Sequence, residues 1–148
     1  MATADYSHLA GHRFPGGTYT LDGYVNWLWE DCILADHDGA CAHPSLAYFV
    51  AMAGLGASIG EVMSLLNGSP DSGVVFGENE LELHGVLRAD ATYECAGEII
   101  AVERKSGRRA GVFDKLTFRI EVRECGASAT TAICTSSWIF PRHSDDDA

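Results

Sequence analysis

The sequence predicts an α+β fold: two helical segments, followed by three or four long antiparallel strands that pack on one of the helices. Two observations support this prediction. The spacing of apolar residues changes from three or four to two after Gly73, which marks a change from helix to strand. The segment after Pro44 is apolar on nearly all sides, so we expect that helix to be buried. The sequence therefore indicates one sheet layer with a buried helix as its core.

The first helix is expected at residues 22–34, with Asp22 as its cap. Spacings of three and four predict its apolar face, formed by Val25, Leu28, Trp29 and Cys32. We expect all three tryptophans of the chain to serve as core or dimer-interface residues.

The second helix is expected to begin at Ser45, because proline is favoured at the start of a helix and Pro44 precedes a run rich in alanine and leucine. The strands follow as extended runs joined by short, turn-like connections. They are predicted at residues 74–83, 91–103, 112–124 and 128–141. Long strands with short turns form an antiparallel meander.

We expect a single domain at residues 17–142, a loose lead-in at 1–16 and an acidic tail at 143–148. The chain has 148 residues and a net charge of −11. A strongly acidic surface repels polyanions, so neither nucleic acid nor an anionic membrane is an expected partner.

The cysteines indicate a reduced compartment. There are five, an odd number, and none forms a C-x-x-C pair, so neither a disulfide framework nor a cysteine zinc site fits. The first residues lack the basic and apolar regions of a signal peptide. We therefore expect a cytoplasmic protein without a metal or other cofactor.

Three stretches of the chain resemble parts of a known family. Residues 74–92, which include His84-Gly-Val-Leu-Arg-Ala-Asp-Ala-Thr92, resemble a strand that ends in a phrase of the type H-R-P-L-R-A-G-D-T. Residues 96–111 resemble the hairpin that follows it, and residues 42–48 resemble the start of the central helix. The family with these features is that of the MaoC-like hot-dog proteins, the (R)-specific enoyl-CoA hydratases and 3-hydroxyacyl dehydratases. The resemblance covers residues 40–142 and implies a hot-dog fold, in which a curved antiparallel sheet wraps around a central helix.

The same resemblance implies an activity on acyl thioesters of coenzyme A or of acyl carrier protein. Hydration of 2-enoyl thioesters, or the reverse dehydration, is the first hypothesis, and thioester hydrolysis is an alternative. It also implies a homodimer, or a heterodimer with a second hot-dog subunit. An edge strand left unpaired in a single sheet favours such self-association as well.

The expected catalytic pair is Asp38 and His43, because MaoC-like hydratases carry an Asp and a His separated by four residues. A histidine near neutral pKa suits proton transfer, and a carboxylate can orient it or share that work. Asp36 and His37 are the fallback pair, although adjacent residues in an extended loop point apart.

The substrate-binding residues are expected at the helix start and at a basic turn. Free amides at Ser45 and Leu46 would bind the thioester oxygen. Tyr48 lies in the same segment, and Arg108 and Arg109 would meet coenzyme phosphates or an acidic carrier protein.

The departures from the family favour a second hypothesis, a non-catalytic subunit of a heteromeric dehydratase. Cys41-Ala42 stands where the family has Asn-Pro, and the stretch between the catalytic histidine and the central helix is missing. The dehydratases of fatty-acid synthesis, a second hot-dog branch, carry a catalytic Glu within the central helix. The helix from Ser45 to Leu55 contains no acidic residue, so their mechanism is excluded. Cys41 remains a minor candidate for a nucleophile.

Overall fold

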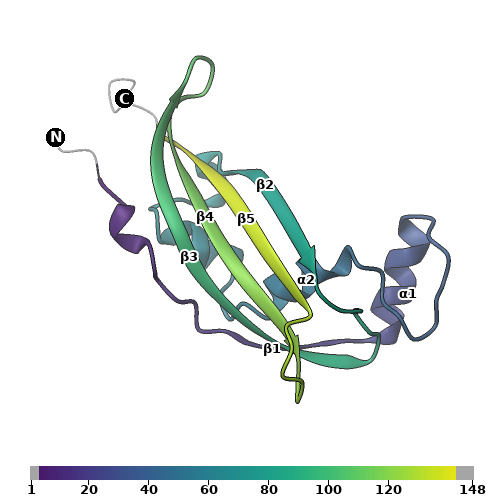
Figure 1. Cartoon of the computed structure of the whole chain (residues 1–148). Helices are drawn as coiled ribbons and strands as arrows, with labels where there is room; N and C mark the ends of the chain where they lie inside the picture. Colours follow the sequence, from purple (N-terminus) through teal and green to yellow (C-terminus); the bar gives the residue numbers. More distant parts are fainter. Residues whose placement is uncertain (1–3, 143–148) are drawn as a thin grey trace.

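A computed structural model describes residues 4–142 and contains one sheet of five strands with three α-helices (Figure 1). The predicted acidic tail lies outside the described residues. The helices and strands, in chain order, are β1 (Gly17–Leu21), α1 (Gly23–Cys32), α2 (Leu46–Ala53), α3 (Ile59–Ser64), β2 (Val75–Leu83), β3 (Ala91–Gly107), β4 (Gly111–Glu124) and β5 (Ala132–Arg142). Short 3-10 helices lie at Ser7–Leu9 and Pro70–Ser72.

The sheet is antiparallel throughout, in the order β1-β3-β4-β5-β2. Strands β3, β4 and β5 form a meander as predicted. The prediction that the strand before them belongs to the same meander is wrong, because β2 pairs with β5 and not with β3. Figure 1 shows these strands curving together, with the β3–β4 hairpin projecting from one end. The predicted α+β architecture is therefore confirmed.

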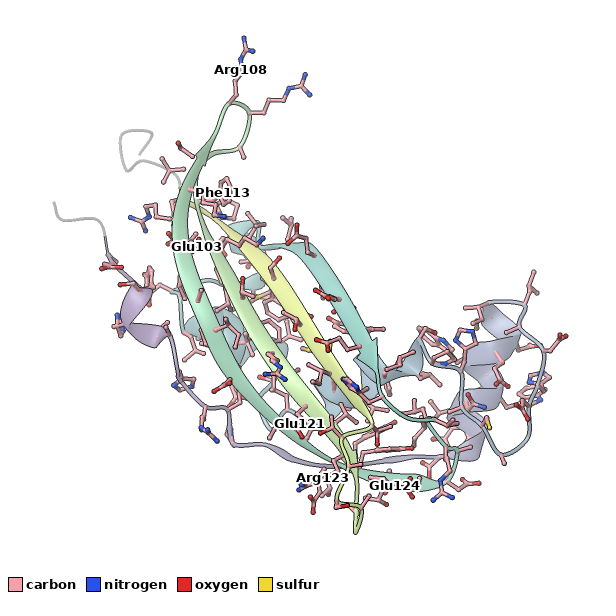
Figure 2. All side chains as sticks on the ribbon, in the orientation of Figure 1. Glu103, Arg108, Phe113, Glu121, Arg123 and Glu124 are labelled. Atoms are coloured by element: carbon pink, nitrogen blue, oxygen red, sulfur yellow. The ribbon has the colours of Figure 1, made fainter. Side chains whose placement is uncertain are left out.

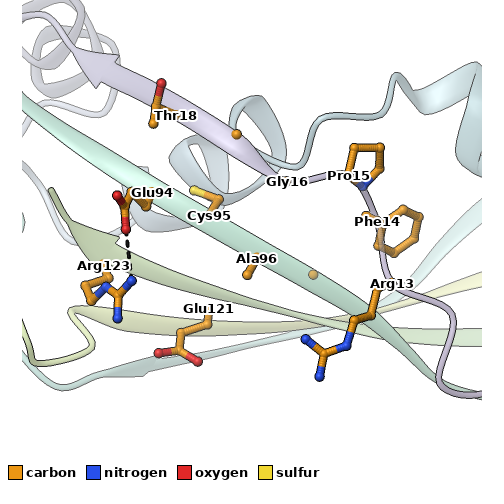
Figure 3. Close-up of a pocket in the computed structure, with 12 residues that line it drawn as sticks. Arg13, Phe14, Pro15, Gly16, Thr18, Glu94, Cys95, Ala96, Glu121 and Arg123 are labelled. Carbon is orange, nitrogen blue, oxygen red and sulfur yellow. Dashed lines mark hydrogen bonds and ion pairs between the residues drawn. The ribbon is translucent and has the colours of Figure 1, made fainter.

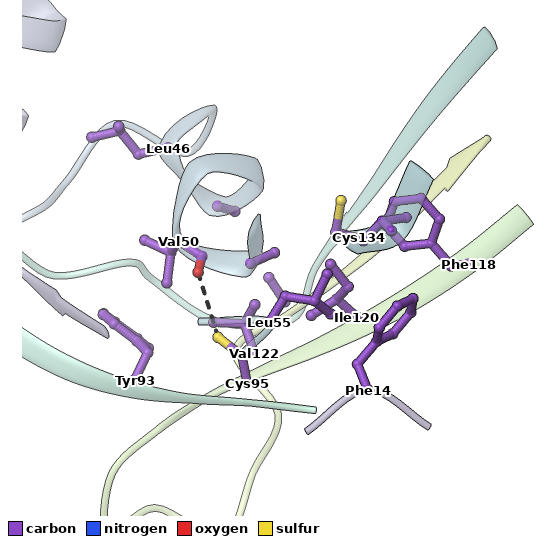
Figure 4. Packing of buried hydrophobic residues seen from close by; sticks show 14 of the residues in the cluster. Phe14, Leu46, Val50, Leu55, Tyr93, Cys95, Phe118, Ile120, Val122 and Cys134 are labelled. Carbon is purple, nitrogen blue, oxygen red and sulfur yellow. Dashed lines mark hydrogen bonds between the residues drawn. The ribbon is translucent and has the colours of Figure 1, made fainter. Parts of the chain in front are cut away.

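Helix α2 packs on the inner face of the sheet, against β1, β3, β4 and β5. Its residues Leu46, Ala47, Val50 and Ala51 are fully buried, as the apolar composition predicts. Phe49 is 42% exposed, so one side of the helix faces outward. Figure 4 shows the buried face of the helix, with Leu46 and Val50, beside the apolar side chains of the strands.

The end of α2 makes a close approach that only glycine allows. A Cβ atom at Gly54 would lie 2.4 Å from the Cys95 sulfur, so a side chain there would push the helix off β3. The buried Cys95 thiol donates to the Val50 carbonyl at 3.5 Å, and burial raises its pKa to about 12. Helix α2 is thus fixed on the sheet by backbone contact as well as by apolar packing.

The segment before β1 is attached to the sheet, contrary to the expected loose lead-in. The Gly11 and Phe14 amides donate to β3 carbonyls at 2.8 and 2.9 Å, and the Phe14 side chain is buried. Strand β1 then pairs with β3 from Gly17 to Leu21 and is an element that the sequence pattern did not predict. Its five residues follow a glycine- and proline-rich stretch that is typical of a loop, and so short a strand gives little alternation of polar and apolar residues.

Helix α1 follows Asp22 as predicted and ends at Cys32, two residues earlier than predicted, but it has neither the predicted capping bond nor the predicted face. The Asp22 side chain makes no capping hydrogen bond, and the Gly23 amide donates instead to the Asp90 carboxylate at 2.7 Å. The buried side chains are Asn26 and Glu30, whereas Leu28 is 50% exposed. Figure 1 shows α1 at the edge of the molecule, away from the sheet face that α2 covers, and of the predicted apolar face Val25 packs against the hydrophobic core.

Candidate active site

A cavity of about 380 Å³ lies between α1, the loop after it and the end of β2. Its wall combines ionisable groups with an apolar surface. The lining residues are Glu30, Asp36, Asp38, Cys41, Ala42, His43, Pro44, Leu83, Gly85, Val86, Leu87, Thr131 and Ala132. A site of this kind excludes much water while keeping a few groups that exchange protons.

The histidine of this cavity, His43, is held by polar contacts from α1 and from the start of α2. Its backbone amide donates to the Asn26 side chain at 2.9 Å, and Asn26 also donates to the Cys41 carbonyl at 3.4 Å. The His43 Nδ1 atom lies 2.7 Å from the Ser45 hydroxyl. Since Asn26 is only 3% exposed, these contacts define the position of His43 from inside the molecule.

The contacts at Nδ1 determine which ring nitrogen carries the proton. The Ser45 backbone amide donates to Nδ1 at 3.3 Å, and the Ser45 hydroxyl already accepts from the Trp29 indole N–H at 2.8 Å. Nδ1 is therefore an acceptor, and the proton of a neutral His43 ring lies on Nε2. His43 is thus oriented as a proton donor through Nε2.

A second acid–base pair, Glu30 and His37, adjoins the same cavity. The Glu30 carboxylate lines the wall and is 3% exposed, and its Oε2 atom lies 2.9 Å from His37 Nδ1. The His37 ring stacks on Trp27 with a centroid distance of 5.3 Å and an interplanar angle of 9°. Trp27 is half-exposed and supports His37, so of its two predicted roles, core or dimer interface, the core role is wrong.

A larger hollow, of about 660 Å³, lies where residues 13–18 run beside β3 (Figure 3). Its charged side chains include Glu94 and Arg123, which form an ion pair of 2.9 Å. No histidine lines it, and the Cys95 thiol on its wall has a pKa raised by burial to about 12. In this hollow the Glu94 carboxylate is paired with Arg123, and the Glu121 carboxylate accepts a hydrogen bond from the Thr130 hydroxyl. The cavity beside α1 brings a histidine together with carboxylates, so it is the candidate site.

No family model matches the sequence, and no curated protein is found as a relative. Solved structures do match. One chain of the ChsH1–ChsH2 complex from Mycobacterium tuberculosis aligns with a TM-score of 0.68 and 16% identity, covering 97% of this chain and 94% of that one. A chain of the HadBC (3R)-hydroxyacyl-ACP dehydratase complex from the same organism aligns with a TM-score of 0.64 and 12% identity, covering 94% and 99%.

The R-hydratase PhaJ1 from Pseudomonas aeruginosa aligns with a TM-score of 0.56 and 11% identity, covering 93% of this chain and 86% of that one. This chain has the hot-dog fold. The fold that the resemblance implied is confirmed, and at these identities the likeness concerns the fold alone.

Within this hot-dog chain, the predicted pair Asp38 and His43 lines one cavity, and so does Asp36 of the fallback pair. Asp38 is exposed, and its backbone carbonyl accepts from the Cys41 amide at 2.8 Å. Among residues 4–142, no hydrogen bond joins the Asp38 carboxylate to the His43 ring. The structure therefore brings the predicted pair to one site without coupling the two side chains.

The expected oxyanion amides at the start of α2 are already occupied. The Leu46 amide donates to the His43 carbonyl at 3.0 Å, and the Ser45 amide donates to the His43 ring. The Leu46 side chain is fully buried in the core. Neither amide is free to bind a thioester oxygen in this arrangement, which corrects that prediction.

The other expected substrate-binding residues lie outside the cavity. Tyr48 contacts Phe76 of β2, with ring centroids 5.9 Å apart, and burial raises the pKa of Tyr48 to about 12. Arg108 and Arg109 lie at the tip of the β3–β4 hairpin, and Figure 2 shows Arg108 pointing away from the rest of the molecule.

Sequence reasoning missed Asn26 and Glu30, which the structure places beside His43 and in the cavity wall. Their spacing of four residues puts both on one face of the predicted helix, and that spacing was the available signal. Across the described part of the chain, no group of three or more metal-ligating side chains gathers. Nor does that part contain a helix of the length and apolarity that crossing a bilayer requires.

Proposed function

We propose that this hot-dog chain is a hydratase or dehydratase of acyl thioesters, acting on 2-enoyl or 3-hydroxyacyl groups carried by coenzyme A or acyl carrier protein. The observation that carries the proposal is the cavity beside α1, where His43 and several carboxyl groups share a largely apolar wall. The structural likeness to chains described as a (3R)-hydroxyacyl-ACP dehydratase and an R-hydratase supports the same reaction class.

The reaction needs a group that delivers a proton to the α-carbon and a group that takes one from water at the β-carbon. His43 suits the first task in its imidazolium form, because Ser45 engages Nδ1 and no group among the described residues hydrogen-bonds to Nε2. A carboxylate of the cavity suits the second, and Asp38 is the carboxylate that the sequence pairs with His43. An apolar wall strengthens both interactions by limiting competition from water.

We also propose that the chain works as a dimer in the cytoplasm. Arg108 and Arg109 lie at the hairpin tip, whereas the cavity lies beside α1, so these arginines meet a substrate in the cavity only from another subunit. All five cysteines are free, which fits a reducing compartment.

The test measures the loss of enoyl absorbance with crotonyl-CoA and longer 2-enoyl-CoA thioesters, with mass analysis of the products. We expect His43→Ala to lower turnover by about 10²–10⁴-fold, the usual contribution of a positioned acid or base. The exposed His8 provides the matched control, so His8→Ala should keep full activity. Release of free coenzyme A without a hydrated product would instead identify a thioesterase.

A non-catalytic subunit of a heteromeric dehydratase is the second candidate. The occupied Ser45 and Leu46 amides favour it, because they leave no oxyanion site at the helix start. Two of the similar structures are also complexes of two different chains. If the purified chain turns over no thioester alone but raises the activity of a second hot-dog chain, this candidate replaces the first.

A further inference from the structure

Glu30 is an ionisable side chain that is almost completely buried, which is uncommon unless the group is paired or functional. It lines the cavity that also contains His43. One carboxylate oxygen, Oε2, is held 2.9 Å from His37 Nδ1. Within residues 4–142, no protein group hydrogen-bonds to the other oxygen, so that oxygen is free to meet a molecule in the cavity.

His37 connects this buried carboxylate to solvent. Its side chain is 40% exposed, whereas the Glu30 side chain is 4% exposed. Stacking on Trp27 holds the ring flat, so its Nδ1 atom stays directed at Glu30. The pair therefore extends from the cavity wall to the surface and can move a proton between them.

Asp36 and Asp38 also line the cavity, but their situation differs. Both are exposed to solvent, and no side chain among the described residues hydrogen-bonds to either carboxylate. A carboxylate whose position is fixed and whose surroundings are dry is a better proton acceptor for bound water than a solvated one. Glu30 has both properties.

We propose that Glu30 is the catalytic carboxylate of this site, and that His37 is its positioning residue. This inference rests on the proposed hydratase or dehydratase function and assigns its second acid–base group to Glu30 in place of Asp38. The substrate is the same class, a 2-enoyl or 3-hydroxyacyl thioester.

In the hydration direction, the Glu30 carboxylate takes one proton from water as the water oxygen bonds to the β-carbon. The π electrons of the double bond move to the α-carbon, which receives the Nε2 proton of the His43 imidazolium, so that the neutral ring remains. Glu30 then passes its proton to His37, whose exposed ring releases one to solvent, and His43 regains one from solvent. The sum is addition of one water molecule, and dehydration follows the same steps in reverse.

The first experiment compares Glu30→Gln with Asp31→Asn and Asp38→Asn by steady-state kinetics on 2-enoyl-CoA thioesters. Glutamine keeps the shape and a hydrogen-bonding oxygen but takes no proton. We expect Glu30→Gln to lower kcat by about 10²-fold or more with KM changed by less than about threefold. Asp31 is the exposed neighbour of Glu30 on α1, so Asp31→Asn should match the unmodified protein.

His37 is tested by a pair of variants that separates positioning from folding. His37→Asn keeps an N–H donor near Glu30 Oε2, whereas His37→Ala removes it. We expect kcat to fall in both variants and to recover partly in His37→Asn, with equal unfolding midpoints. Equal kcat in the unmodified protein and His37→Ala would remove His37 from the mechanism.

A second readout does not depend on turnover. An apolar carbodiimide should modify Glu30, and saturated butyryl-CoA, which cannot be hydrated, should protect it, as mass spectrometry of peptides would detect. Turnover with full activity in Glu30→Gln overturns the assignment of Glu30 and leaves the proposed function standing. Absence of turnover in the unmodified protein overturns the proposed function. In that case, protection of Glu30 by butyryl-CoA supports its place in a thioester-binding site, and lack of protection overturns the inference about Glu30.

Discussion

Helix α2 buries Leu46 and Val50 completely, whereas helix α1 buries Asn26 and Glu30 and leaves Leu28 half-exposed. The two helices have opposite relations to the molecule. α2 is held by apolar contact with four strands, and α1 is held by hydrogen bonds to the loop that carries His43. Changes in α2 should therefore alter stability, and changes on the buried face of α1 should alter the cavity.

Cysteine reactivity should show the largest difference between the two regions. Cys95 lies under the end of α2 with its pKa raised to about 12 by burial, and Cys32 is exposed at the end of α1. Because the thiolate is the reactive form, we expect alkylation of Cys95 at pH 8 to be at least about 100-fold slower than that of Cys32. Peptide mass spectrometry over a time course measures both rates, and equal rates would mean that α2 does not cover β3.

A matched pair of leucine substitutions separates the two helices by stability. Leu46→Ala opens a cavity in the core and should lower the free energy of unfolding by about 2–5 kcal/mol. Leu28→Ala on α1 should change it by no more than about 0.5 kcal/mol, because that side chain is half-exposed. Urea unfolding of both variants measures the difference, and a larger loss for Leu28→Ala would show that another surface covers α1.

Substitution of the buried Asn26 should lower the free energy of unfolding less than Leu46→Ala does, and it tests whether α1 holds His43. Asn26→Ala leaves the His43 amide and the Cys41 carbonyl without their partner, at a cost of about 1–3 kcal/mol. Hydrogen exchange at the His43 amide should quicken at the same time. Tyr24→Ala is the control on the same helix, since Tyr24 is 66% exposed. Unchanged exchange would show that Asn26 does not hold His43.

Much of the fold was predictable, because the signals that specify it are local. Alternating side chains predicted β2 to β5 with small errors at their ends, and proline with an apolar run predicted α2. Strand β1 was missed, because five residues carry too little alternation to be recognised and its pairing with β3 is a contact across 70 residues.

Less of the candidate site was predictable. Asp38 and His43 line one cavity, and their catalytic role stays a prediction, whereas the Ser45 and Leu46 amides already donate hydrogen bonds to His43. The sequence did not predict that Glu30 lines the cavity, because that position depends on which face of α1 turns inward. Val25 is the α1 residue that packs against the hydrophobic core, and Asn26 joins the same helix to the loop that carries His43.

The sequence by itself determined the class of fold, the order of α1, α2 and the strands β2 to β5, and the loop that contains Asp38 and His43. Periodicity and turn chemistry are properties of neighbouring residues, so they can be read along the chain. The tertiary structure alone decided that α1 turns Asn26 and Glu30 inward, that Ser45 holds the Nδ1 atom of His43, and that Glu30, hydrogen-bonded to His37, lines the same cavity as His43. Those features depend on burial and on contacts between distant segments, which no local pattern encodes.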